Sequence, residues 1–133
     1  MADCIFCKIA KKEIPSDIVY EDKKTMTFLD INPMSLGHIL VVPKKHYETF
    51  DELDQENLKE LSLTLQKVAK AVKKIADGYT LLQNNIVEQG VPHVHFHIVP
   101  RKRSDSLHFH LPSKKFSQQE TNKIKDRIKT LLK

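Results

Sequence analysis

The sequence contains no tryptophan and only two cysteines among its 133 residues. Lasting disulfides are uncommon in reducing compartments, so this pair does not indicate a disulfide framework. No apolar run approaches the roughly 20 residues that a membrane span requires. The first ten residues, MADCIFCKIA, lack the basic and then apolar build of a secretory signal peptide. We therefore expect a cytoplasmic protein with no membrane partner.

A concentrated basic surface is also missing, although the formal net charge is +5 at pH 7. Lysines occur in pairs that are scattered along the chain, with acidic residues between them, and only Arg101–Arg103 forms a basic cluster. A nucleic-acid-binding surface usually concentrates basic residues on one face and adds aromatic side chains. We therefore predict no nucleic-acid partner and interpret most of this charge as solvated surface.

The length allows a single domain, 1–133, with a proper hydrophobic core. Runs rich in Val, Ile, Tyr and Phe, bounded by turn residues, predict three strands within 17–30 and 38–43. Two later stretches, YTLLQN at 79–84 and HVHFHIVP at 93–100, predict two more strands. The sequence contains no internal repeat and no low-complexity segment.

Between these strands the apolar spacing changes to that of a helix. Six apolar residues from Leu58 to Ile75 recur at intervals of three and four, which predicts one long amphipathic helix with Gly78 as its C-terminal stop. The last fifteen residues, 119–133, predict a second helix with Ile124, Ile128 and Leu131 along one side. Strands, a long central helix and short connections indicate an α+β domain built on an antiparallel sheet of about five strands.

Three histidines occupy alternate positions in GVPHVHFHIVPR. In a strand, residues two apart share a face, so His93, His95 and His97 should line one face while the apolar residues between them pack on the other. An ordinary solvent-exposed strand face would mix Thr, Lys and Glu, so this pattern favours a functional site.

A metal site is one explanation for part of this cluster. Zinc is bound by about four Cys or His ligands, and Cys4 and Cys7 form a CxxC pair near the N-terminus. Redox CxxC pairs usually follow a strand and open a helix, whereas this pair has nothing ahead of it, which favours metal binding over redox chemistry. His46 and His93 could complete a closed, structural Cys2His2 set.

Such a set leaves His95 and His97 for chemistry. Neutral imidazole is a good nucleophile near pH 7 and, unlike a hydroxyl, needs no activating base. Attack by His95 on phosphorus would give a covalent phosphohistidine-type intermediate, and His97 on the same face could contact the phosphate or the leaving group. The sequence shows no Walker-type phosphate loop, so side chains and local backbone amides would hold an anion.

The motif HVHFHIV matches the alternating signature of the histidine triad (HIT) superfamily of nucleotide hydrolases and transferases. The stretches CIFCKIAKKEIPSDIVYED, TFLDINPMSLGHILVVPKKH and HVHFHIVPR resemble the zinc-containing Hint branch and occur in the expected order. The resemblance implies an HIT-like fold with a core at about 4–101, a tail and helix at 102–133, and a homodimer.

The same resemblance implies an enzyme and assigns roles to residues. The expected reaction is hydrolysis of purine nucleoside phosphoramidates (AMP-NH2 or AMP-lysine type) at the α-phosphate, through a nucleotidyl-histidine. His95 resembles the nucleophile and His97 the histidine that contacts the α-phosphate and bridging atom. One structural zinc per chain is implied, with four ligands: Cys4, Cys7, His46 and His93.

A purine nucleotide derivative of AMP is the implied partner. Asp30 falls where relatives hydrogen-bond the ribose hydroxyls, Phe28 and Ile31 fall near the base pocket, and His38 corresponds to a buried histidine that orients the site. Core packing is the alternative for Phe28 and Ile31. The stretch QNNIVEQGVPH departs from the family pattern, being about two residues shorter with Gln-Gly in place of Gly-Gln, and offers three candidate phosphate contacts: Asn84, Asn85 and Gln89.

Other functions remain open at this point. One is a dinucleoside polyphosphate hydrolase of the Fhit type, and another is a non-catalytic nucleotide-binding scaffold. A third is a metal hydrolase with all three motif histidines on one catalytic ion, although only Glu88 is close enough in sequence to supply the carboxylate base. A second HxH pair, His108 and His110, lacks the flanking apolar pattern, and we interpret it as surface.

Overall fold

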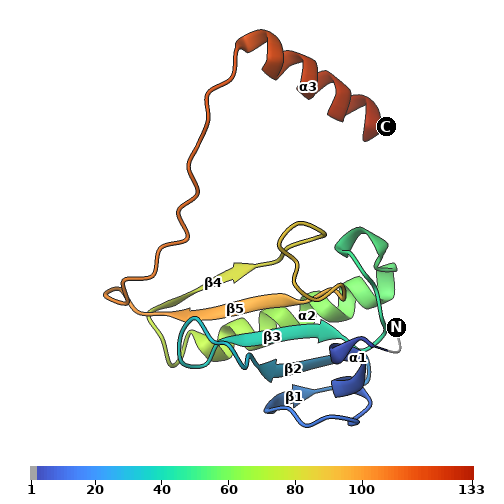
Figure 1. Ribbon diagram of the computed structural model, residues 1–133, viewed down its shortest axis with the longest axis vertical. Coiled ribbons are helices and arrows are strands. Elements are labelled where there is room, and N and C mark those ends of the chain that lie inside the picture. Colours follow the sequence, from blue (N-terminus) through green and yellow to red (C-terminus); the bar gives the residue numbers. More distant parts are fainter. Residues whose placement is uncertain (1–2) are drawn as a thin grey trace.

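The computed structural model describes residues 3–133 and has one five-stranded antiparallel sheet with three α-helices (Figure 1). The strand order is β1-β2-β3-β5-β4, so β3 is the central strand and β5 lies between β3 and the edge strand β4. The strands are β1 (Ile18–Glu21), β2 (Thr25–Leu29), β3 (Ile39–Pro43), β4 (Gly78–Leu82) and β5 (Phe96–Arg101). The predicted α+β class and five-stranded sheet are confirmed.

The helices differ in how they meet this sheet. They are α1 (Ile5–Ala10), α2 (Gln55–Val72) and α3 (Gln118–Leu131), and a short 3-10 turn, η1 (Phe50–Glu52), precedes α2. Helix α2 crosses one face of the sheet, and α1 covers part of the opposite face (Figure 1). Helix α3 lies apart from the sheet at the end of an extended segment, and every residue from 108 to 133 is exposed.

Alternation along the strands divides the core between these two faces. Val41 of β3 packs with Leu61 and Val68 of α2, whereas its neighbours Leu40 and Val42 pack with α1. Leu61, Val68 and Val72 recur along one side of α2, which is why this helix buries a single stripe. The α1 face of the sheet is the one that carries His97, because His97 pairs with Leu40 in the β3–β5 register.

A small polar cluster joins β2 to α2 inside this core. Asp22 accepts hydrogen bonds from the backbone N–H groups of Lys24 and Thr25 at 3.0 and 2.8 Å and from the Thr25 hydroxyl at 2.9 Å. The Thr25 and Thr64 hydroxyls lie 2.8 Å apart, and Thr64 also reaches Asp22 at 3.3 Å. These contacts satisfy buried polar groups where α2 crosses the sheet.

Two details differ from the predicted elements. The long helix ends at Val72, so Gly78 is not its stop but the first residue of β4, and Ile75 is 70% exposed. The final strand begins at Phe96, which places His93 and His95 just before it. Pro43 explains the second difference, because proline has no N–H to extend the β3–β5 ladder, and Val94 N–H instead donates to the carbonyl of Tyr47.

Two further predictions concern exposure. His108 and His110 lie on the exposed segment after β5, as expected for surface residues. Within residues 3–133, no helix is both long and apolar enough to cross a membrane.

Candidate functional site

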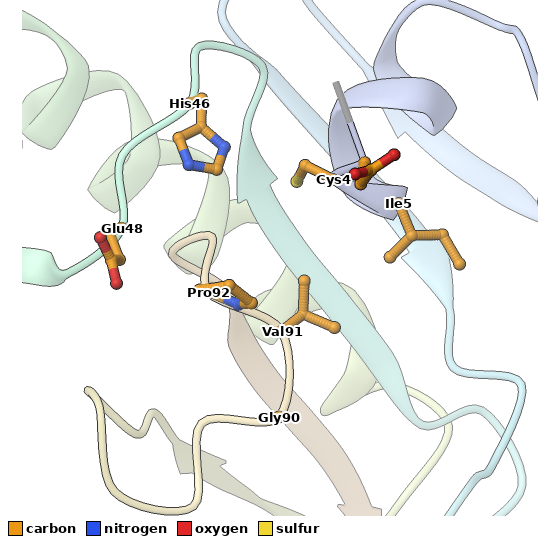
Figure 2. A pocket seen from close by; sticks show the side chains of 8 residues that line it. Cys4, Ile5, His46, Glu48, Gly90, Val91 and Pro92 are labelled. Carbon is orange, nitrogen blue, oxygen red and sulfur yellow. The ribbon is translucent and has the colours of Figure 1, made fainter. Parts of the chain in front are cut away.

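The structure brings the four predicted metal ligands together from three distant segments. Cys4 is the N-cap residue of α1 and Cys7 lies within that helix, while the loop after β3 supplies His46 and the loop before β5 supplies His93. Their four donor atoms all lie within 4.8 Å of one another. Figure 2 shows the Cys4 side chain pointing from α1 towards His46, above a cavity of about 510 Å³ that Val91 and Pro92 also line.

The separations between these donors suit a tetrahedral ion. Cys4 Sγ lies 3.3 Å from His93 Nδ1, Cys7 Sγ lies 3.4 Å from His46 Nδ1, and the two Nδ1 atoms lie 3.2 Å apart. Zinc bonds of ordinary length would place sulfur and nitrogen about 3.6 Å apart and two nitrogens about 3.3 Å apart. The four residues could therefore hold a metal ion with almost no rearrangement.

The protonation of these ligands also fits a metal. His93 Nε2 lies 2.8 Å from the carbonyl oxygen of Pro43 and must donate to it, which leaves the Nδ1 lone pair facing the thiols. Burial lowers the pKa of His93 to about 4, so the ring is neutral, as a metal ligand must be. Burial and the adjacent Cys4 raise the pKa of the Cys7 thiol to about 11 without a metal, and a bound cation would reverse that effect.

A second cavity, of about 440 Å³, opens on the α1 face of the sheet beside this cluster. His95 and His97 form part of its wall, together with Phe28 and Asp30 from the end of β2 and the loop that follows β4. The rings of His95 and His97 lie edge to face, with centroids 5.1 Å apart. The predicted catalytic residues and the predicted nucleotide-binding residues other than His38 and Asn85 thus share one cavity, and the predicted metal ligand His93 is not part of it.

His95 is held in one tautomer by the backbone. Its Nδ1 lies 2.7 Å from the carbonyl oxygen of His93, and because a carbonyl only accepts, Nδ1 carries the proton. The Nε2 atom is left with its lone pair free for the cavity. Burial lowers the pKa of His95, so the ring is unprotonated near neutral pH. This combination is what a nucleophilic imidazole requires.

The opposite tautomer follows for His97. Met34 N–H donates to His38 Nδ1 at 3.0 Å, so the proton of neutral His38 sits on Nε2, and that atom lies 2.9 Å from His97 Nδ1. His97 Nδ1 therefore accepts, and its own proton is on Nε2. Burial, together with the neighbouring His95 and His38, lowers the pKa of His97 to about 4. Two neutral histidines thus offer a lone pair and an N–H side by side.

The other predicted nucleotide contacts differ in their surroundings. Phe28 is buried and serves both the core and the cavity wall, whereas Ile31 is 82% exposed, so core packing does not explain it. Asp30 accepts from Asn32 N–H at 2.8 Å, and its second oxygen lies 3.5 Å from His38 Nε2. His38 is buried behind His97.

The loop between β4 and β5 separates its three candidates. Asn84 and Gln89 line the cavity, and Asn85 instead accepts from the Phe50 N–H at 2.8 Å. Gln89 is buried, and its amide both accepts from Ile86 N–H at 2.9 Å and donates to the Glu48 carbonyl at 2.6 Å. Gln89 therefore fixes the shape of this loop.

Sequence reasoning missed part of the cavity wall. Helix α1 contributes three apolar residues, and the turn after it and the loop after β2 contribute more: Ile5, Phe6, Ile9, Ile14 and Met34. The spacing of Phe6 and Ile9 on one side of a short helix was the available signal. Phe6 is notable because its ring packs against His93 and His95, with centroids 5.7 and 5.0 Å away.

The motif histidines do not converge on one ion. In residues 3–133, two groups of potential ligands have donors within 4.8 Å of one another, and neither combines His93 with His95 and His97. One is the Cys2His2 set, and the other joins His38 to two residues of the cavity wall, Asp30 and His97. This separation disfavours the metal hydrolase with three histidine ligands.

Comparison with known proteins agrees with this geometry. The HIT domain family model matches residues 11–104. An adenosine 5′-monophosphoramidase of Schizosaccharomyces pombe is 39% identical over 133 residues, covering 98% of each chain. An uncharacterized HIT-like protein of Methanocaldococcus jannaschii is 50% identical over 105 residues, covering 77% of this chain and 81% of that protein.

A solved structure extends the agreement to three dimensions. The histidine triad nucleotide-binding protein from Candida albicans aligns with a TM-score of 0.85 at 35% identity, covering 98% of this chain and 97% of that one. The family match covers well over half of the sequence, and the fold and motif order agree with it. The chain belongs to the HIT domain family.

Proposed function

We propose that this protein hydrolyses purine nucleoside phosphoramidates at the α-phosphate, through a nucleotidyl intermediate on His95. The observation that carries the proposal is the 2.7 Å contact between His95 Nδ1 and the His93 carbonyl, which leaves Nε2 unprotonated in a cavity of nucleotide size. The family and the phosphoramidase relative point to the same chemistry.

The nucleoside would enter at the β2 side of the cavity. Phe28 and Ile31 offer apolar surface for the base, and the Asp30 carboxylate offers an acceptor for the ribose hydroxyls. Asn84 also lines the cavity and would supply a side-chain amide to the phosphate from the other side. Gln89 has both ends of its amide occupied by the backbone, so its role would be to shape the loop rather than to bind phosphate.

In the first step, His95 Nε2 attacks the α-phosphorus and a P–N bond to the protein forms as the P–N bond to the leaving amine breaks. The amine must gain a proton as it takes the electron pair. An anionic phosphate raises the pKa of adjacent imidazoles, so the His38–His97 pair takes up one proton with substrate, and His97 Nε2 delivers it.

In the second step, water attacks the same phosphorus and the His95–phosphorus bond breaks. The water proton passes to the vacant Nε2 of His97, and the nucleoside monophosphate leaves. His95 returns to its neutral form with Nδ1–H still on the His93 carbonyl. The two steps divide one difficult displacement into two easier ones.

Zinc is the metal that we propose for the Cys2His2 cluster, with a structural role. A closed set of four protein ligands has no open position for substrate. The ion would tie α1 to the loops that carry His46 and His93, and α1 forms part of the cavity wall.

The test uses adenosine 5′-phosphoramidate with the wild-type protein and His95→Ala. We expect AMP release from the wild type, none from the variant, and retained AMP binding in both. Intact-mass analysis of wild-type protein quenched during turnover should show one added adenylyl group. His108→Ala, which changes an exposed histidine outside the cavity, is the matched control and should keep full activity.

The same assay separates the rivals. AMP binding without turnover in the wild type would identify a scaffold, and full activity of His95→Ala would exclude the nucleophile. Faster cleavage of a dinucleoside polyphosphate than of the phosphoramidate, compared side by side, would favour the Fhit-type reaction.

A homodimer in the cytoplasm is also part of this proposal. Strand β4 is an edge of the sheet, and its Tyr79 and Leu81 are 39% and 48% exposed, which suits pairing with a second copy. Sedimentation analysis should give twice the chain mass, and a monomer at all concentrations would contradict this.

A further inference from the structure

We propose that Glu88 selects substrates whose leaving group carries a positive charge. This inference rests on the proposed function and concerns which phosphoramidates the site prefers. The charges on the cavity wall are opposite in sign to the net charge of the protein.

The protein has 22 Lys and Arg residues against 17 Asp and Glu. The cavity wall reverses this balance. Of the described residues that form it, the only ones with a formal charge at pH 7 are Asp30 and Glu88, both carboxylates. Its histidines, His95 and His97, offer ring nitrogens rather than a fixed charge. A single phosphate can be met by N–H groups here, but additional phosphates would meet two negative charges.

The two carboxylates lie on opposite sides of the reacting histidines. Asp30 follows β2 and Glu88 lies in the loop after β4, while His97 is on β5, and the strand order is β2-β3-β5-β4. Three strand spacings, about 14 Å, separate β2 from β4. If Asp30 binds the ribose, Glu88 is at the end of the cavity where the leaving group must lie.

The two carboxylates also differ in their hydrogen-bond and ion-pair partners. Asp30 already accepts from Asn32 N–H and lies near His38. Within residues 3–133, the Glu88 carboxylate has no hydrogen-bond or ion-pair partner. A carboxylate that is exposed, unpaired and on the cavity wall is available to a cation on the ligand.

The loop holds Glu88 in this place. Asn84 donates from its side chain to the Glu88 carbonyl at 3.2 Å, and Gln89 anchors the next residue to the Glu48 carbonyl. The backbone of Glu88 is left-handed, with φ of 58°, a conformation that is uncommon for residues other than glycine. These contacts fix the direction in which the side chain leaves the backbone.

The chemistry that fits is an amine leaving group with a second, protonated amine, as in a diamine or a lysine-type side chain. Its ammonium would pair with Glu88 while its other nitrogen is bonded to phosphorus. A nucleotide or pyrophosphate leaving group would bring negative charge to the same carboxylate and be disfavoured.

The experiment compares two AMP phosphoramidates of equal length, made from 1,5-diaminopentane and from n-hexylamine. For the wild type we expect kcat/KM to favour the diamine conjugate by about twofold to fivefold, as for an exposed ion pair. The preference should fall as salt is added. In Glu88→Gln the ratio should fall to about one, and in Glu88→Lys it should invert.

Glu60→Gln removes a carboxylate from α2, on the opposite face of the sheet, and is the matched control that should keep the wild-type ratio. An unchanged ratio in Glu88→Gln, or no preference in the wild type, would overturn the role of Glu88. Failure of the wild type to release AMP from either conjugate would instead overturn the proposed function.

Discussion

His38 Nε2 and His97 Nδ1 lie 2.9 Å apart, and the backbone N–H of Met34 fixes which of them donates. Because Met34 donates to His38 Nδ1, the proton of His38 points at His97, and the proton of His97 points away on Nε2. His38, which lies behind the cavity wall, thus determines that Nε2 is the nitrogen of His97 that carries the hydrogen.

Replacing His38 should therefore weaken turnover through His97. We expect His38→Ala to lower kcat by about tenfold to a hundredfold, at the low end of acid–base effects, with a smaller change in KM. Nitrogen-15 NMR of the wild type should show His97 protonated at Nε2, and the variant should show a mixture of tautomers. An unchanged tautomer with lowered kcat would assign His38 a merely structural part.

Metal removal should loosen α1. If zinc occupies the Cys2His2 cluster, the protein should contain about one zinc per chain, and Cys4→Ser should lose most of it. Chelation should lower the midpoint of thermal unfolding of the wild type but leave that of Cys4→Ser almost unchanged. A wild-type midpoint that is insensitive to chelation would contradict the structural role.

Acid should remove the stabilisation that Asp22 provides. Burial alone would raise the pKa of Asp22, but hydrogen bonds from Thr25, Lys24 and Tyr20 outweigh it and lower that pKa. A carboxyl whose pKa is lower in the folded state stabilises it above the unfolded pKa of about 3.9 and loses this effect as pH falls through the folded value. Asp22→Asn should thus cost about 1 to 3 kcal/mol at pH 7.

Denaturant unfolding at pH 7 and near pH 3 measures whether the stabilisation by Asp22 falls with pH. The gap in unfolding free energy between wild type and Asp22→Asn should narrow at the lower pH. Glu60→Gln serves again as the control, and a gap that stays constant with pH would mean that the charge of Asp22 contributes nothing.

Removal of residues 112–133 should leave the rest of the fold intact. Every residue in this stretch is exposed, so its loss uncovers no core. We expect the midpoint of thermal unfolding to stay within about 2 °C of the full chain at low protein concentration. A larger fall would show that α3 stabilises the fold through contacts with a second copy.

The end of α2 shows where periodicity misleads. Ile75 continues the apolar spacing of the helix, yet the chain leaves the helix at Val72. Lys74 and Ile75 N–H groups donate to the carbonyls of Ala71 and Val72, a tighter turn that needs no glycine. Gly78 was the stronger signal in the sequence, but it serves the start of β4.

The histidine motif was easier to predict than its surroundings. Alternation predicted that His95 and His97 share a face, and both line one cavity although only His97 lies within β5. Nothing local in the sequence shows that Phe6 packs on His95, or that Gln89 is tied to Glu48, because both contacts depend on how α1 and the β4–β5 loop dock on the sheet. Glu88 was noticed only as a possible base, since its free carboxylate emerges from the loop's shape.

The group that orients the His95 ring is the backbone carbonyl of His93 rather than a side chain. A backbone carbonyl is common to all twenty amino acids, so no point mutation at position 93 can delete it. A substitution there removes the proposed metal ligand, while the carbonyl that orients the proposed nucleophile His95 remains. If both proposals hold, descendants of this gene could lose the metal and keep the reaction, so metal binding and catalysis would be separable in evolution.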